Sequence, residues 1–420
     1  MSTDQGRGAS SPQLMRRANR QALLRLALGG APFTAADAMA ATGLTRATVL
    51  GVCAELRDAG WLEETGPGAR DGDGRDESSE RGRSEVVGAQ RGRPARHYRL
   101  RSEAGLLVGV DAGEHTLTVQ IADLVGRPRA TLSRTLPGGV ASGAAARIRA
   151  LRELIDRALT EADALACARV LTVVGVPAPV DEHGRSPQDE VGFWSTMNPD
   201  LGDALADGAG RVLVENDANL AAIAEHAGGR GPHVATLLMG ERFGAGLIVD
   251  GHLLRGSRGG AGEMRFLDIA LEDGHGADGV AALARRWMLE QRAEEFAPAR
   301  ASSLARIPAE DLTAVDVFRA AEGGDPLALA VLDRIGDRLA RIVAILSSLL
   351  GADTVVVAGA IAGAIEPVLT RARRALPDLT SPPHPRVVAS EHGSEVVVRG
   401  AIDLALARLR QDPLGHLDRA

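Results

Sequence analysis

The sequence contains no lysine, so all 48 of its basic residues are arginines. This absence excludes a lysine nucleophile, a Schiff-base lysine and the lysine of a Walker A phosphate loop. Only two cysteines are present, Cys53 and Cys167, and they lie far apart in apolar patterns. Such usage is typical of a reducing cytoplasm and argues against a disulfide framework or a cysteine zinc site. No run of about 18 apolar residues occurs, so we expect a cytoplasmic chain without a membrane span or signal peptide.

Charge is distributed unevenly along the 420 residues. Residues 1–101 carry a net charge of +4, whereas the remainder carries −11. A basic end on an acidic body indicates that the N-terminal part meets a polyanion and that the rest does not. The length allows two or three domains. We expect a disordered tail at 1–12, a first domain at 13–101 and a second domain at 105–420.

Residues 19–64 predict short helices followed by a strand. Apolar positions at helical spacing place these elements at 19–28, 35–41, 46–59 and 61–64. Thr34 and Asp37 fit a capping box, Gly43 lies in the next turn, and Thr45 can cap the third helix. Helix, glycine-containing turn and helix is the layout in which the later helix of a DNA-binding protein enters the major groove. A plain three-helix bundle is the alternative.

The exposed start of the third helix supplies candidate DNA contacts. Arg46 suits guanine or phosphate, and Thr45 and Thr48 suit phosphate or thymine methyl groups. Residues 66–90 are rich in Gly, Ser, Asp, Glu and Arg, which predicts a disordered loop. Residues 91–101 hold five arginines and no acid, so two strands around the loop would form a wing, unless this is a solvated linker. The wing would contact the minor groove or the backbone through Arg91, Arg93 and Arg96.

From Leu106 onward, strands alternate with helices, which predicts an α/β architecture. Buried strands are expected at 106–111, 117–122, 170–176, 211–215, 234–239, 245–249 and 354–358. Helices are expected at 144–162, 218–227, 279–296, 325–350 and 396–409. Two strand-rich halves would form two lobes. The first would span about 105–230 plus a C-terminal helix at 396–410, and the second about 231–390.

The most specific motif is Glu215-Asn216-Asp217-Ala218-Asn219, where a predicted strand opens into a helix. It is similar to the E-N-D-A-N segment of the ROK family (repressors, open reading frames and kinases). Gly92-Arg93-Pro94-Ala95 likewise resembles the wing of the family's repressors. This resemblance implies a winged helix-turn-helix followed by a two-lobed, actin-like (ribonuclease-H-like) sugar kinase fold. It also implies that Asn216 and Asp217 bind sugar hydroxyls. A helix cap without any ligand is the alternative.

Two loops that hold ATP phosphates in family kinases are altered here. The first reads D-x-G-G-T in the family, and Glu114 and His115 stand at its second glycine and its threonine. The second reads G-T-G-x-G-x-G, and Glu241 and Arg242 stand at its threonine and middle glycine. A carboxylate beside a triphosphate repels it. We therefore expect no ATP-dependent catalysis and no cofactor, with Asp217 at the vestigial position of the kinase base.

The family segment A-G-E-x-G-H is partly retained. Glu263 stands at the glutamate that binds sugar hydroxyls, whereas Arg265 and Phe266 replace the glycine and histidine. Phe193 and Trp194 fall near the sugar in the family and would either stack on a ring or belong to the core. We expect no metal, because the family's zinc cysteines are replaced by Asp273, His275 and Val280.

Together these features predict a DNA-binding regulator, a repressor of carbohydrate-metabolism genes. Its kinase-like domain would sense a sugar or sugar derivative through Asn216, Asp217 and Glu263. We expect double-stranded operator DNA as a partner and a homodimer or homotetramer, since two half-sites require two recognition helices. Two alternatives stay open: an active ROK sugar kinase with an appended DNA-binding domain, and a ligand-blind regulator controlled by a protein partner.

Overall fold

The computed structural model describes most of the chain, and its residues divide into two compact units. The described ranges are 12–66, 96–165, 167–188, 192–206, 210–264, 271, 274–276, 278–293 and 302–417. The first unit comprises the described residues of 1–106, 123–127 and 406–420, and the second those of 107–122 and 128–405. The predicted tail at 1–12 and the predicted insertion at 66–90 lie outside the described residues, apart from Pro12 and Gly66.

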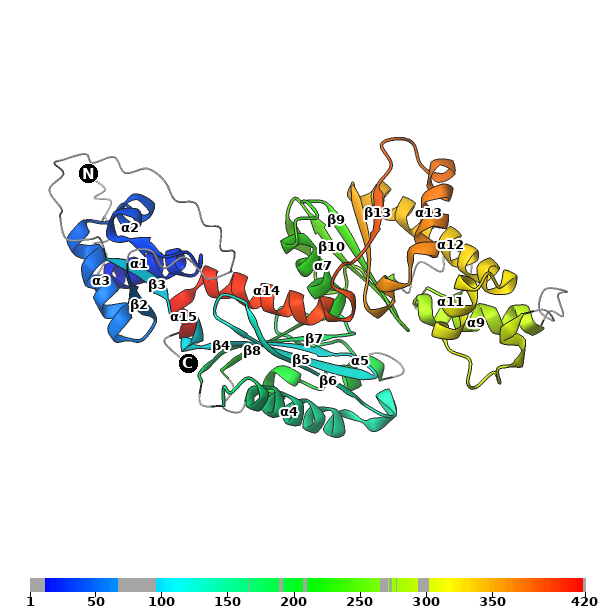
Figure 1. Cartoon of the computed structure of the whole chain (residues 1–420), viewed down its shortest axis with the longest axis horizontal. Coiled ribbons are helices and arrows are strands. Elements are labelled where there is room, and N and C mark those ends of the chain that lie inside the picture. Colours follow the sequence, from blue (N-terminus) through cyan, green and yellow to red (C-terminus); the bar gives the residue numbers. More distant parts are fainter. Residues whose placement is uncertain are drawn as a thin grey trace, which may run out of the picture. The chain divides into compact units, whose positions relative to one another are not determined.

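The described residues from 12 to 100 form three helices and a small sheet, drawn in blue and cyan in Figure 1. The helices are α1 (Pro12–Ala27), α2 (Ala35–Thr42) and α3 (Arg46–Asp58). The strands β1 (Phe33–Thr34), β2 (Leu62–Thr65) and β3 (His97–Leu100) pair antiparallel in the order β1-β3-β2. This is the topology of a winged helix-turn-helix. The core side chains include Leu23, Leu24, Val49, Cys53, Leu56, Leu62 and Tyr98.

Local sequence signals determine the helix boundaries in this unit. Both bonds of the predicted capping box are present, because Thr34 accepts from the N–H of Asp37 and the Asp37 carboxylate accepts from the N–H of Thr34. Gly43 adopts a φ of 71° and ends α2 in the left-handed conformation that glycine tolerates best. Thr45 caps α3 as predicted. Helix α1 begins earlier than the predicted Asn19, at Pro12.

The end of the chain belongs to the same compact unit. From Leu406 onward, helix α14 (Val396–Gln411) lies in this first unit, and α15 (Pro413–Leu417) follows it. The Arg25 side chain of α1 donates from Nη2 to the carbonyl of Gln411 at 2.6 Å and from Nε to the carbonyl of Arg410 at 3.1 Å. Since the last carbonyls of a helix lack partners within it, Arg25 acts as a cap for α14.

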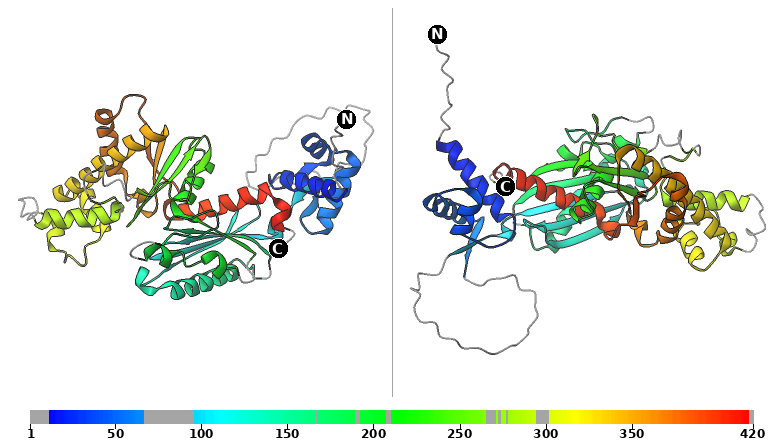
Figure 2. Two further views of the ribbon diagram at one scale, coloured as in Figure 1. Left: turned by 180° about the vertical axis from the view of Figure 1, so that it is seen from behind. Right: turned by 90° about the horizontal axis from the view of Figure 1, so that it is seen from above.

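Among the described residues of the second unit, the first sheet has five strands in the order β6-β5-β4-β7-β8. Their bounds are β4 (Leu106–Ala112), β5 (Thr116–Asp123), β6 (Pro128–Thr135), β7 (Arg169–Val176) and β8 (Arg211–Asn216). Helix α4 (Ala144–Glu161) lies along one face (Figures 1 and 2). The beginning of α14 approaches Gly175 so closely that a Cβ there would lie 2.7 Å from a methyl group of Val397.

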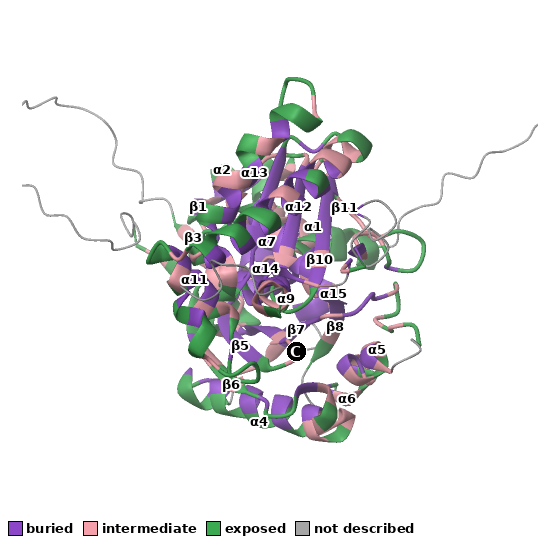
Figure 3. Ribbon diagram, turned by 90° about the vertical axis from the view of Figure 1, so that its right-hand side faces the viewer, coloured by how far each residue is buried: buried purple, intermediate pink, exposed green. Residues whose placement is uncertain are grey.

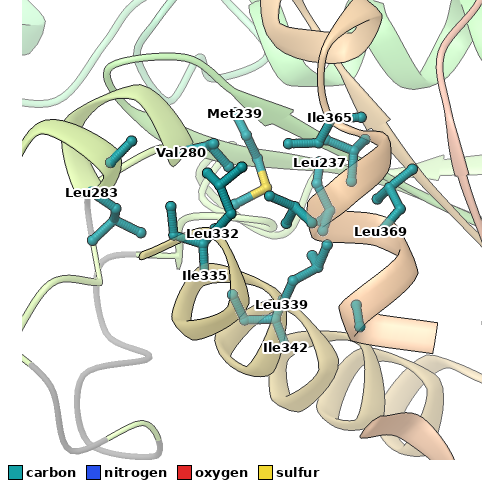
Figure 4. Packing of buried hydrophobic residues seen from close by; sticks show 14 of the residues in the cluster. Leu237, Met239, Val280, Leu283, Leu332, Ile335, Leu339, Ile342, Ile365 and Leu369 are labelled. Carbon is teal, nitrogen blue, oxygen red and sulfur yellow. The ribbon is translucent and has the colours of Figure 1, made fainter. Parts of the chain in front are cut away.

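A second five-stranded sheet, again counted among the described residues, has the order β11-β10-β9-β12-β13. Its strands are β9 (Val234–Met239), β10 (Phe243–Val249), β11 (His252–Leu254), β12 (Thr354–Ala358) and β13 (Arg386–Ala389). Helix α7 (Asp217–Ala227) contacts β9 and β10. Buried apolar side chains of this sheet form one cluster with those of four helices. These are α9 (Val280–Ala293), α11 (Ala314–Glu322), α12 (Pro326–Leu350) and α13 (Glu366–Leu379). In Figure 4, Leu332 and Ile335 of α12 face Met239 of β9.

The remaining described elements are short. They are α5 (Phe193–Met197), α6 (Leu201–Ala204) and the 3₁₀ turns Ser102–Ala104, Gly139–Ser142, Ser303–Arg306, Ala360–Gly363 and Gly393–Glu395. Figure 3 shows buried strands beneath helices whose outer faces are exposed, as expected for sheets covered by helices. The predicted α/β class is confirmed. None of the described helices has both the length and the apolar character needed to cross a bilayer.

Candidate functional site

A cavity of about 480 Å³ lies inside the second unit. Its walls come from the β4–β5 turn, the junction of β8 with α7, helix α5, the β9–β10 turn, the segment before Met264 and the beginning of α14. The structure brings all three predicted ligand-binding residues to this cavity, Asn216, Asp217 and Glu263. Sequence-distant segments therefore meet around one space large enough for a small molecule.

Asn216 is held in place by the backbone at the start of α7. Its side-chain oxygen accepts from the N–H of Asn219 at 3.0 Å, and its amide donates to the carbonyl of Ala178 at 3.1 Å. The cap that we considered as an alternative to ligand binding is therefore present. One amide hydrogen and one lone pair are left over for another partner. Glu215 supports this turn, because it accepts from the Asn219 amide at 2.9 Å and pairs with Arg255 at 2.7 Å.

Several carboxyl groups line the cavity and interact with one another. Burial raises the pKa of Asp217 well above its ordinary value, and the negative charges of Asp111 and Glu263 raise it further. Burial also raises the pKa of Asp111 to about 7, although Arg147 and a backbone hydrogen bond from Gly113 oppose the shift. Arg147 is itself buried and donates to the carbonyl of Ala112, and burial lowers its pKa to about 10. The cluster thus disfavours the ionised form of Asp217, and burial would penalise an added carboxylate or phosphate in the same way.

The two altered loops meet each other at the cavity wall. Glu114 lies in the β4–β5 turn and Arg242 in the β9–β10 turn, and Arg242 Nε donates to Glu114 Oε2 at 3.3 Å. The Arg242 guanidinium also lies 3.5 Å from the centre of the Phe193 ring, a cation–π contact. Phe193 is buried and Trp194 lies beside it in the wall. Arg242 is thus engaged by a carboxylate and an aromatic face at once.

Other lining residues were not predicted, among them Thr116, Thr118, Ser394, Val396 and Val397. The alternation of β5 places both threonines on one face, a signal that could have found them. No motif marks the beginning of α14.

The expectation of no metal rested on residues that the structure covers only in part. Arg265, Phe266 and Asp273 lie outside the described residues. His275 lies 3.6 Å from Asp278, which also pairs with Arg286 at 2.9 Å. Within the described ranges, no three His, Cys, Asp or Glu side chains gather closely enough to hold a metal ion.

The candidate DNA contacts of α3 lie together at its first turn. Arg46 is exposed, whereas Thr48 is half-buried and its hydroxyl lies 2.9 Å from that of Thr45. Arg96 is exposed immediately before β3 and pairs with Glu64 at 3.1 Å. Arg91 and Arg93 lie outside the described residues.

Comparison with known proteins covers both parts of the chain. The sequence model of the ROK family matches residues 107–408. The glucokinase of Thermotoga maritima is 29% identical over 319 residues, which make up 72% of this chain and 98% of that enzyme. The glucokinase of Halalkalibacterium halodurans is 30% identical over 175 residues, so the match spans 38% of this chain and 51% of that enzyme.

Two solved structures show how far the fold extends. A ROK family transcriptional regulator, described as a homolog of the E. coli MLC protein, has a TM-score of 0.71 at 20% identity and covers 97% of this chain and 100% of its own. A ROK family glucokinase from Streptomyces griseus, in complex with glucose and AMPPNP, has a TM-score of 0.57 at 26% identity. The match covers 71% of this chain and 99% of the glucokinase. The predicted fold, a winged helix-turn-helix followed by a two-lobed actin-like body, is confirmed. This chain belongs to the ROK family.

Proposed function

We propose that this protein is a DNA-binding transcriptional regulator, a repressor of carbohydrate-metabolism genes, whose kinase-like body senses a sugar without phosphorylating it. The observation that carries this proposal is the Glu114–Arg242 pair at 3.3 Å. It joins the two loops that resemble the phosphate-binding loops of family kinases. A carboxylate placed there opposes the triphosphate that a kinase must hold.

The cavity suits an uncharged sugar. Five acidic residues line it: Asp111, Glu114, Asp217, Glu241 and Glu263. Arg242 also lines the cavity, but its charge is already paired with Glu114. Carboxylates accept hydrogen bonds from vicinal hydroxyls, whereas they repel phosphorylated or acidic sugars. The remaining amide hydrogen of Asn216 and the side chains of Asp217 and Glu263 would orient the ring.

The N-terminal unit would supply the DNA contacts. Its described residues have the winged helix-turn-helix topology, and α3 begins with an exposed arginine. A repressor built on this unit requires two copies, since half-sites about one helical turn apart are read by two recognition helices. The sugar would act only if it binds the DNA-competent and DNA-free conformations with different affinities.

A direct test combines a gel shift with an assay of ATP hydrolysis. The full chain is titrated against DNA from upstream of its own gene, with and without a panel of neutral sugars. We expect specific binding that one sugar weakens, and no sugar-dependent hydrolysis. Specific binding that no sugar alters, with no sugar raising the melting temperature, would instead support control by a protein partner.

An active kinase is the second candidate, because Asp217 is retained in the cavity and glucokinases are among the relatives. Sugar-dependent turnover near about one per second, abolished in Asp217→Asn, would establish this activity and overturn a purely regulatory role.

A further inference from the structure

Helix α3 exposes one large apolar side chain. Leu50 retains 38% of its surface in contact with solvent. The apolar residues that hold α3 to the core, Val49, Val52, Cys53 and Leu56, are buried. Leu50 is therefore at the surface of this unit and is not one of its buried core residues.

The surroundings of Leu50 allow close approach to a flat or grooved partner. Ala47 and Gly51 are exposed on the same side of the helix, and a Cβ added to Gly51 would meet nothing within 4 Å. Arg46 lies four residues before Leu50, a spacing that places both side chains on one helix face.

The hydroxyl groups at the helix start are already engaged. Thr45 Oγ1 accepts from the N–H of Thr48 at 3.3 Å, and the two hydroxyl oxygens lie 2.9 Å apart. These threonines stabilise the first turn, so they are weak candidates for reading base edges. Arg46 and Leu50 are the longer side chains that project from this half of the helix.

Charge determines which half of α3 can enter a DNA groove. The acidic residues Glu55 and Asp58 lie in the C-terminal half, and Arg57 is bound there by Asp58 at 2.9 Å and by Glu64 at 3.0 Å. The first turn contains no acidic residue. The N-terminal half is therefore the part that a phosphate-lined groove accepts.

We propose that Leu50 contacts the C5-methyl group of a thymine in each operator half-site and so reads that base. The inference rests on the proposed function, since it requires that α3 enters the major groove. The thymine methyl is the apolar group that the major groove presents, and a leucine side chain neither donates nor accepts a hydrogen bond. Ala47 and Gly51 let the backbone come near enough for this contact. Arg46, one turn earlier, is then positioned for a nearby guanine or phosphate.

Replacing thymine by deoxyuridine tests the contact without altering any hydrogen-bonding group of the base. An operator is first selected from random DNA with the wild-type chain, and its thymines are then replaced one at a time. We expect one position in each half-site at which the wild type loses about fourfold in affinity. This factor corresponds to the ~0.8 kcal/mol gained by burying one methyl-sized group. Leu50→Ala should bind more weakly and should not respond to uracil at that position.

Leu349→Ala is the matched control, because this leucine is 75% exposed at the end of α12. It should bind both DNAs as the wild type does. Specific binding without any uracil-sensitive thymine, or equal sensitivity in the wild type and Leu50→Ala, would overturn this inference alone. Failure of the wild type to select any DNA sequence would overturn the proposed function as well.

Discussion

Arg46 and Arg242 each lie where a phosphate could be bound, but their surroundings differ. Arg46 opens α3, is exposed, and forms no ion pair with any residue that the structure describes. Arg242 lies in a loop that holds phosphate in family kinases, yet it pairs with Glu114 and lies against Phe193. The guanidinium charge is therefore available to a ligand in the N-terminal unit, whereas in the cavity a carboxylate neutralises it.

Under the proposed function, this difference would give one chain two sites of opposite charge preference. A basic side chain contributes to polyanion binding only while its charge is uncompensated, because a neighbouring carboxylate cancels its field at short range. The N-terminal unit thus suits the phosphate backbone of DNA. The cavity, where carboxylates surround a paired arginine, suits a neutral polyol.

The largest effect is expected from Arg46→Ala. Removing an open arginine from the recognition helix should weaken operator binding about tenfold or more at physiological salt, since a base or phosphate contact is lost. Arg57→Ala is the matched control, because Arg57 is already bound by Asp58 and Glu64 and should matter far less. Fluorescence anisotropy measures both. Equal losses in the two variants would break the contrast between open and paired arginines.

A smaller effect should reveal how strongly the cavity disfavours the ionised form of Asp217. The pKa of Asp217 is raised in the folded protein, so the unfolded chain gives up this proton at a lower pH than the folded chain does. The stabilisation that this group contributes is present below its ordinary pKa and is lost as the pH rises through the raised value. Asp217→Asn should therefore raise the melting temperature at pH 8, by roughly 2 °C, and change it less at pH 5.

Calorimetric scans at the two pH values measure this difference. Asp353→Asn, at an exposed position of the same unit, should show no comparable gain. A melting temperature that falls in Asp217→Asn at pH 8 would mean that the ionised carboxylate is stabilised in the cavity rather than penalised.

The parts of the molecule that the sequence predicted are those with local signals. The caps at Thr34 and Thr45 depend on residues three positions away, so the helix-turn-helix could be located from spacing alone. Strand β6 was missed because Ala130 is its only buried residue, so its apolar pattern is weak. The pairing of Glu114 with Arg242 joins residues 128 positions apart. The sequence identified both as departures from a kinase, but only the fold shows that they compensate each other.

The smallest expected effect comes from breaking that pair. In Glu114→Gln, Arg242 loses its carboxylate partner and becomes more like Arg46. A half-exposed ion pair is worth about 0.2–1 kcal/mol, so the binding of inorganic pyrophosphate in the cavity should strengthen only about 1.4- to 5-fold. Titration calorimetry measures this change, with the exposed Glu182→Gln, which does not line the cavity, as control. The gain should disappear in the double variant Glu114→Gln/Arg242→Ala. If pyrophosphate binds the double variant with the same affinity as it binds Glu114→Gln, the gain does not come from Arg242. In that case, ion pairing would not explain the difference between Arg46 and Arg242.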